Sequence, residues 1–162
     1  CVVFGWFWTA IVFLLLNRIG DGLDGAMARQ TRPTNSGAFL DIVLDFFFYS
    51  LFVLGFALND PKNAVYTSVL IFAFVTTGSS FLAFSIMAER LGIKSQIYSN
   101  KGFYYLGGLT EGFETIMFFI GLCLWPQFFP PMALAFAFLC LATAIFRVYF
   151  GYKTLKRADQ TL

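Results

Sequence analysis

Five long apolar stretches restrict what this chain can fold into. They lie at about residues 1–17, 36–58, 64–88, 109–124 and 131–152, and the first has a polar continuation to Arg29. A helix that crosses a bilayer needs about 20 mostly apolar residues, and these stretches approach or exceed that length. The composition agrees, because 59% of the residues are apolar and 12% are charged, against about 45–50% and about 25% in soluble domains. The sequence therefore predicts an all-α, polytopic transmembrane helix bundle, with five spans in a single domain over residues 1–162.

The basic residues predict how these spans are oriented. In a five-span layout, eight Lys and Arg residues fall on one side of the membrane and Lys62 falls on the other. The eight are Arg29, Arg32, Arg90, Lys94, Lys101, Lys153, Lys156 and Arg157. Cytoplasmic loops have the excess of Lys and Arg in membrane proteins, so we expect the first loop, the third loop and the C-terminus to be cytoplasmic. Residue 1 would then lie outside, and we expect an N-terminally incomplete domain that lacks one upstream span.

The residue inventory excludes several kinds of chemistry. The chain has no histidine, which excludes Ser-His-Asp catalysis and imidazole metal ligands. Its three cysteines, Cys1, Cys123 and Cys140, stand apart in apolar surroundings, as packing residues do, and lack the spacing of a zinc site. The net charge is only +2 and the aromatic residues lie inside apolar runs, so we expect no nucleic acid partner. We interpret the Phe-rich spans as lipid-facing bulk without a specific function.

Four acidic residues lie within 25 positions, at the expected cytoplasmic ends of two neighbouring spans. They are Asp21, Asp24, Asp41 and Asp45. At about 100° per residue, Asp21 and Asp24 share one arc of the first helix, and Asp41 and Asp45, four residues apart, share one face of the next. A short connection makes these helices antiparallel neighbours. We therefore expect the four carboxylates to face one pocket.

Four carboxylates near a membrane need compensating charge, because each is costly there and they repel one another. Oxygen ligands select hard cations, and Mg²⁺ or Mn²⁺ is favoured where phosphates share the coordination. We therefore predict two divalent ions. A solvated, salt-bridged helix end is the simpler alternative.

Small residues flank the acids: Gly25, Ala28, Gly37 and Ala38. They would leave empty volume beside the metal positions, but small residues also let membrane helices pack closely. Both interpretations remain open on spacing alone. Together with the carboxylates, the empty volume favours a diphosphate site.

The same residues resemble the motif of the CDP-alcohol phosphotransferase (CDP-alcohol phosphatidyltransferase) family. That motif reads D-x2-D-G-x2-A-R, a spacer, then G-x3-D-x3-D. All eight of its defining residues are present between Asp21 and Asp45, and the spacer, Gln30–Ser36, is one residue shorter than the usual eight.

The resemblance implies an integral membrane enzyme with six transmembrane helices, usually a homodimer, whose first helix would be missing here. Members transfer a substituted phosphate, commonly phosphatidyl, from a CDP-alcohol such as CDP-diacylglycerol to an acceptor alcohol, and release CMP. In phospholipid biosynthesis the partners would be this donor lipid, the acceptor and membrane lipids. The active site would lie at the cytoplasmic face, in a bacterial inner membrane.

The family pattern also implies roles for individual residues. Asp21, Asp24 and Asp41 would ligate metal, and Asp45 would serve the second metal and act as general base. Gly25, Ala28, Arg29 and Gly37 would line the CDP pocket, Gly25 and Ala28 admitting the cytidine and Arg29 reaching phosphate. Chemistry supports the base independently, because a chain without histidine needs a carboxylate to take the alcohol's proton.

Some features lie outside the motif. Arg147 and Glu114 are charges inside apolar spans, and they either pair with each other or leave Arg147 to bind a phosphate. Glu111 lies one turn from Glu114 and nearer the surface. We interpret residues 76–80 as a close helix contact.

Two other functions remain possible: a divalent-cation channel or transporter, and a catalytically silent membrane scaffold.

Overall fold

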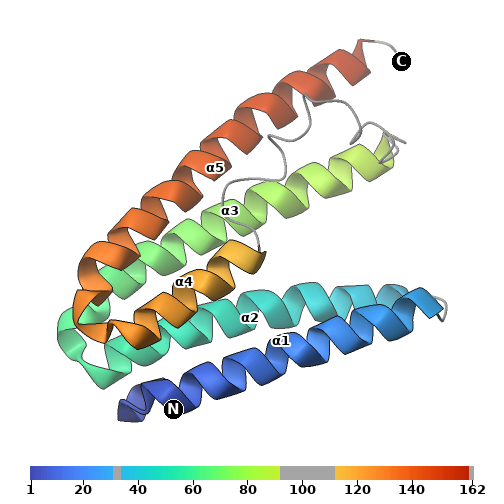
Figure 1. Cartoon of the computed structure of the whole chain (residues 1–162). Helices are drawn as coiled ribbons and strands as arrows, with labels where there is room; N and C mark the ends of the chain where they lie inside the picture. The colour runs from blue at the N-terminus through green and yellow to red at the C-terminus, as the bar shows by residue number, and fades with distance from the viewer. Residues whose placement is uncertain (31–33, 92–111, 161–162) are drawn as a thin grey trace.

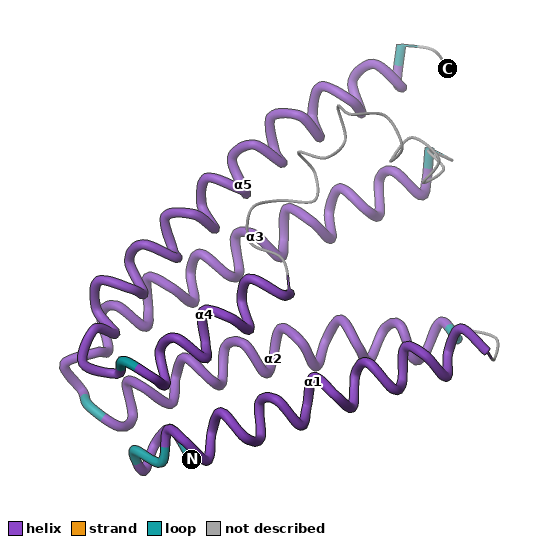
Figure 2. The backbone as a smooth tube through the Cα atoms, viewed as in Figure 1, coloured by secondary structure: helices purple, strands orange, loops and turns teal. Residues whose placement is uncertain are grey.

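The computed structural model describes residues 1–30, 34–91 and 112–160, and over 21–30 it describes the backbone alone. Within these residues the chain forms α-helices and short 3-10 turns and no strand. The five α-helices are α1 (Phe7–Gln30), α2 (Asn35–Asn59), α3 (Ala64–Arg90), α4 (Gly112–Leu124) and α5 (Phe129–Asp159), and the 3-10 turns are η1 (Val2–Phe4), η2 (Pro61–Asn63) and η4 (Pro126–Phe128). The helices form one bundle (Figure 1). Short turns join α2 to α3 and α4 to α5 at the same end (Figure 2).

The predicted all-α transmembrane bundle is confirmed. Three segments are long and apolar enough to cross a membrane by length and composition: Asn35–Asn59, Pro61–Arg90 and Pro126–Asp159. The apolar parts of the other two helices, Phe7–Gly20 and Gly112–Leu124, are shorter. Residues 109–111 of the expected fourth span lie outside the described residues.

The first helix begins later than the apolar pattern predicts. Residues Val2–Phe4 form a 3-10 turn, and Gly5 ends it in the left-handed region, at φ 70°. Glycine adopts this conformation without the steric cost that a side chain imposes, and α1 then begins at Phe7. The amide Nδ2 of Asn59 donates to the Val3 carbonyl at 3.1 Å, which fixes the N-terminal turn against the end of α2.

Several phenylalanines form the core, so the prediction that they face lipid is wrong for this group. Phe56, Phe119 and Phe129 are 0–1% exposed. The Phe52 and Phe119 rings stack with centroids 4.4 Å apart, and the Phe56 and Phe129 rings stack at 4.6 Å. Others, such as Phe138 at 71% exposure, do lie on the outside. The aromatic stack joins α2, α4 and the start of α5.

The contact predicted for residues 76–80 is confirmed. Helix α3 packs most extensively against α5, and the Thr77 hydroxyl donates to the Cys140 carbonyl at 3.0 Å. On its α2 side, a Cβ atom added at Gly78 would overlap Cε1 and Cζ at the edge of the Phe46 ring. Small residues allow membrane helices to approach in this way.

Gly78→Ala should therefore destabilise the protein by about 1–3 kcal/mol, the usual cost of overpacking. Thermal unfolding in detergent measures this cost. Gly20→Ala is the matched control, because a Cβ at Gly20 meets nothing within 4 Å and alanine is the better helix former. In a Phe46→Leu background the cost of Gly78→Ala should shrink. An equal cost in both backgrounds would contradict the contact.

Candidate active site

The start of α2 is fixed by a local hydrogen bond. Thr34 is the N-cap, and its Oγ1 accepts from the Gly37 backbone N–H at 3.1 Å. This cap satisfies one of the free N–H groups at the helix start. A Cβ at Gly37 would lie 3.0 Å from the same oxygen, so the cap favours glycine there. The structure thus gives Gly37 a role in the cap, and its role in nucleotide binding stays a prediction.

A cavity of about 400 Å³ lies among α2, α3, α4 and α5. Four helices line it. The lining residues are Asp41, Ile42, Asp45, Phe46 and Tyr49 of α2; Phe74, Thr77, Gly78 and Phe81 of α3; Gly112 and Thr115 of α4; and Cys140 and Arg147 of α5. Asp41 and Asp45 thus lie on the wall of one cavity, as their spacing of four residues predicts. Arg147 contributes positive charge to the same cavity.

Arg147 is buried, with 5% of its surface exposed. Its Nη1 donates to the Thr77 carbonyl at 3.0 Å, and its guanidinium carbon lies 5.4 Å from the centroid of the Phe81 ring. Both partners belong to α3, so α3 fixes this cation of α5 at the cavity. Glu114 lies exposed in the first turn of α4. A pairing of Glu114 with Arg147 stays a prediction, and Glu111 lies outside the described residues.

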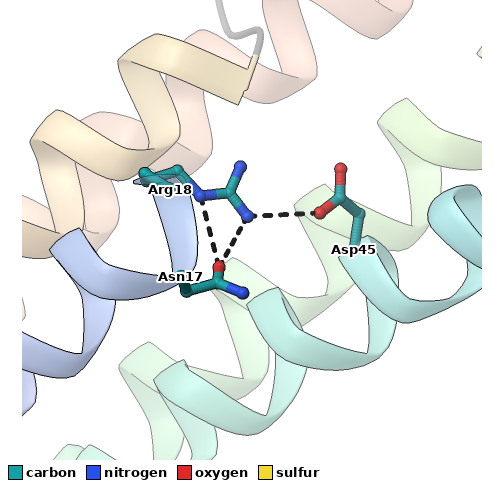
Figure 3. A network of polar contacts seen from close by, with 3 residues as sticks. All are labelled: Asn17, Arg18 and Asp45. Carbon is teal, nitrogen blue, oxygen red and sulfur yellow. Dashed lines mark hydrogen bonds and ion pairs between the residues drawn. The ribbon is translucent and has the colours of Figure 1, made fainter. Parts of the chain in front are cut away.

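Arg18 of α1 reaches Asp45 of α2 (Figure 3). Its Nη2 lies 3.6 Å from Oδ1 of Asp45. The same Nη2 donates to Oδ1 of Asn17 at 2.7 Å, and its Nε donates to that oxygen at 3.3 Å. The Arg18 and Asp45 side chains are 26% and 39% exposed. The guanidinium thus makes a short hydrogen bond with Asn17 and a longer ion pair with Asp45.

The first half of the motif belongs to α1. Asp21 and Asp24 lie nine and six residues before the last residue of α1, and Asp41 and Asp45 lie six and ten residues after the first of α2. At about 1.5 Å per residue, both pairs lie about 9–15 Å from the connected ends of the two helices. The backbone thus places both acidic pairs at one level of an antiparallel pair (Figure 1). The side chains of Asp21, Asp24, Gly25, Ala28 and Arg29 lie outside the described side chains.

The described donors suit a hard cation. Asp41 and Asp45 supply carboxylate oxygens, the ligand type that Mg²⁺ and Mn²⁺ prefer. The guanidinium of Arg18 lies beside Asp45. Among the side chains that the structure describes, no three acidic or cysteine groups gather into a metal site. Asp21 and Asp24 are outside that set, so the four-carboxylate centre stays a prediction.

Sequence reasoning missed some of the residues around the cavity. Nothing in the local pattern links Thr77, Thr115 or Tyr49 to Asp41, because these residues meet only through packing. Arg18 was not missed: it lies three residues before Asp21 and shares its side of a helix, and the sequence indicates it as a cation near the acids, too little with Arg29 to compensate all four.

The described basic residues at helix ends lie toward the same end of the bundle as the motif. Arg90 ends α3, and Lys153, Lys156 and Arg157 lie in the last turns of α5. These two helix ends point to the same end of the bundle as the last residues of α1 and the first residues of α2, whereas Lys62, in η2, lies at the opposite end (Figure 1). This arrangement of the described cations agrees with the predicted charge asymmetry.

Comparison with known proteins gives two matches. The family model described as CDP-alcohol phosphatidyltransferase matches residues 1–149. The curated protein named inner membrane protein YnjF, of Escherichia coli (strain K12), is 52% identical over 153 residues, which cover 94% of this chain and 74% of that protein. No solved structure matches the chain. The matched region contains the motif aspartates and Arg147 alike.

Proposed function

This integral membrane chain belongs to the CDP-alcohol phosphatidyltransferase family, and from that premise we propose a specific reaction. The protein transfers a phosphatidyl or similar substituted phosphate from a CDP-alcohol, such as CDP-diacylglycerol, to an acceptor alcohol and releases CMP. The pathway is phospholipid biosynthesis. The observation that supports this most is the single cavity whose lining includes Asp41, Asp45 and the buried Arg147.

The proposed metal centre uses the four motif aspartates. Asp21, Asp24, Asp41 and Asp45 would hold two divalent ions, Mg²⁺ or Mn²⁺. Such ions neutralise a diphosphate and stabilise a departing phosphate group. Phosphoryl transfer depends mainly on positioning and charge neutralisation, and clustered carboxylates meet that need.

The chain's own residues then bind and orient the substrates. Asp45 takes the proton from the acceptor hydroxyl as general base. Arg147, fixed by Thr77 and Phe81, binds a phosphate oxygen of the donor or the acceptor, because a guanidinium matches phosphate geometry. Gly25, Ala28, Arg29 and Gly37 line the nucleotide pocket, with Arg29 at phosphate.

Location and assembly complete the proposal. The basic ends of α3 and α5, on the same side of the bundle as the motif, support an active site at the cytoplasmic face, in keeping with the positive-inside rule. A bacterial inner membrane and a homodimer are proposed on the family resemblance.

The decisive experiment is a CMP-release assay on the purified chain. CDP-diacylglycerol and Mg²⁺ are combined with a panel of alcohols that includes glycerol 3-phosphate, inositol phosphate and serine. CMP should appear only when donor, metal and an accepted alcohol are all present, and EDTA should stop it. If no alcohol gave CMP while vesicles with the protein took up divalent cations, the chain would be a cation transporter. Neither activity would indicate a silent scaffold.

Arg147→Gln should lower kcat/KM for CMP release by at least about tenfold, because a hydrogen bond to a charged group contributes about 1.5–3 kcal/mol. Steady-state kinetics with a saturating and a limiting acceptor measure the effect. Lys156→Gln is the control, since Lys156 lies on the same helix outside the cavity lining. Equal rates for Arg147→Gln and the unmodified protein would contradict the phosphate role.

A further inference from the structure

Arg18 is a charged side chain placed in an apolar helix, next to a residue of the proposed centre. A cation in a transmembrane segment is costly unless it has a partner or a function. Its guanidinium contacts Asn17 within α1 and Asp45 across the helix pair. The structure therefore places a fixed positive charge beside the proposed general base.

The distances distinguish the two contacts of Arg18. The Nη2 contact of 2.7 Å with Asn17 is a short hydrogen bond, whereas 3.6 Å to Asp45 exceeds hydrogen-bond length. An arginine that binds a carboxylate permanently usually does so through short, paired bonds. Asn17 thus holds the guanidinium by a short hydrogen bond, and the Asp45 side chain, 39% exposed, lies within reach of the same cation.

We infer that Arg18 is a built-in counter-ion for Asp45, which compensates this carboxylate when no metal is bound and opposes metal binding at it. The inference rests on the proposed function, since it requires that Asp45 be a metal ligand. A unit positive charge a few ångströms from a bound cation repels it. Arg18 is therefore a positioning residue, which makes the metal-free protein stable at the expense of metal affinity.

The test measures metal binding and unfolding, without catalysis. Mn²⁺ is titrated into the purified chain in detergent, with binding followed by electron paramagnetic resonance, and melting temperatures are recorded with and without Mn²⁺. Arg18→Gln should bind Mn²⁺ about tenfold more tightly than the unmodified protein, because a repulsive charge is gone. Without metal its melting temperature should fall, and the rise on adding Mn²⁺ should exceed that of the unmodified protein.

Two further variants complete the design. Arg18→Lys retains the positive charge but loses the two hydrogen bonds of the guanidinium to Asn17. Its Mn²⁺ affinity should therefore stay near that of the unmodified protein. This variant also keeps the test decisive if Arg18→Gln folds poorly. Arg157→Gln removes a cation from the end of α5 and should alter neither quantity. Weaker or unchanged Mn²⁺ binding in Arg18→Gln, or tighter binding in Arg18→Lys, would overturn the inference while leaving the proposed function intact. Absence of Mn²⁺ binding by the unmodified protein would overturn both.

Discussion

Asp45→Asn is expected to abolish transfer while CDP-alcohol binding stays largely intact. The amide has the shape of the carboxylate and keeps an oxygen that can ligate a metal ion, but it cannot accept the proton of the acceptor hydroxyl. General base catalysis contributes about 10²- to 10⁴-fold. We therefore expect kcat to fall by about 10²- to 10⁴-fold. CMP release gives the rate, and equilibrium binding of the CDP-alcohol gives the affinity, so chemistry and binding are measured separately.

Asp41→Asn is the matched comparison, one helical turn away on the same cavity wall. Asp41 is proposed as a metal ligand without a proton-transfer role, so this variant should weaken metal and nucleotide binding together. Higher Mg²⁺ should restore part of its activity and none of the activity of Asp45→Asn. Equal, modest losses in both variants would argue against Asp45 as the base.

Gly25→Leu is expected to remove nucleotide binding with little change in stability. Gly25 and Ala28 lie nearly one turn apart on α1, where the proposed nucleotide approaches the helix backbone. A leucine side chain would fill that space, and an overpacking cost of about 1–3 kcal/mol corresponds to an affinity loss of about 5- to 150-fold. Leucine is also a better helix former than glycine by up to about 1 kcal/mol, so the melting temperature should hold or rise. Melting and CDP-diacylglycerol affinity are measured on the same purified sample.

Gly20→Leu serves as its control on the same helix. The space around Gly20 is open, with nothing within 4 Å of an added Cβ, so this variant should retain both stability and affinity. If Gly25 serves helix packing alone, Gly25→Leu should lower the melting temperature and leave the affinity of the folded fraction unchanged. That pattern would refute the nucleotide-pocket assignment.

The sequence predicted the helices well because their signals are local. The bounds of α2 and α3 agree with the apolar runs to within two residues, since a run's length decides whether it can span a bilayer. The start of α1 was missed, because Gly5 adopts a left-handed conformation that an apolar count does not register. The shared wall of Asp41 and Asp45 follows from their spacing of four residues on one helix.

Sequence alone thus determined the all-α membrane fold, the family motif and the pairing of acids along each helix. Tertiary structure decided which residues from different helices meet. It placed Arg147 of α5 at the same cavity as Asp41 of α2, brought Arg18 of α1 to Asp45, and separated the buried Phe119 from the exposed Phe138. The physical reason is that the lipid and the protein interior are equally apolar. Hydrophobicity along the chain therefore identifies the spanning segments, but it does not indicate which face of a helix packs inward or which helix that face contacts.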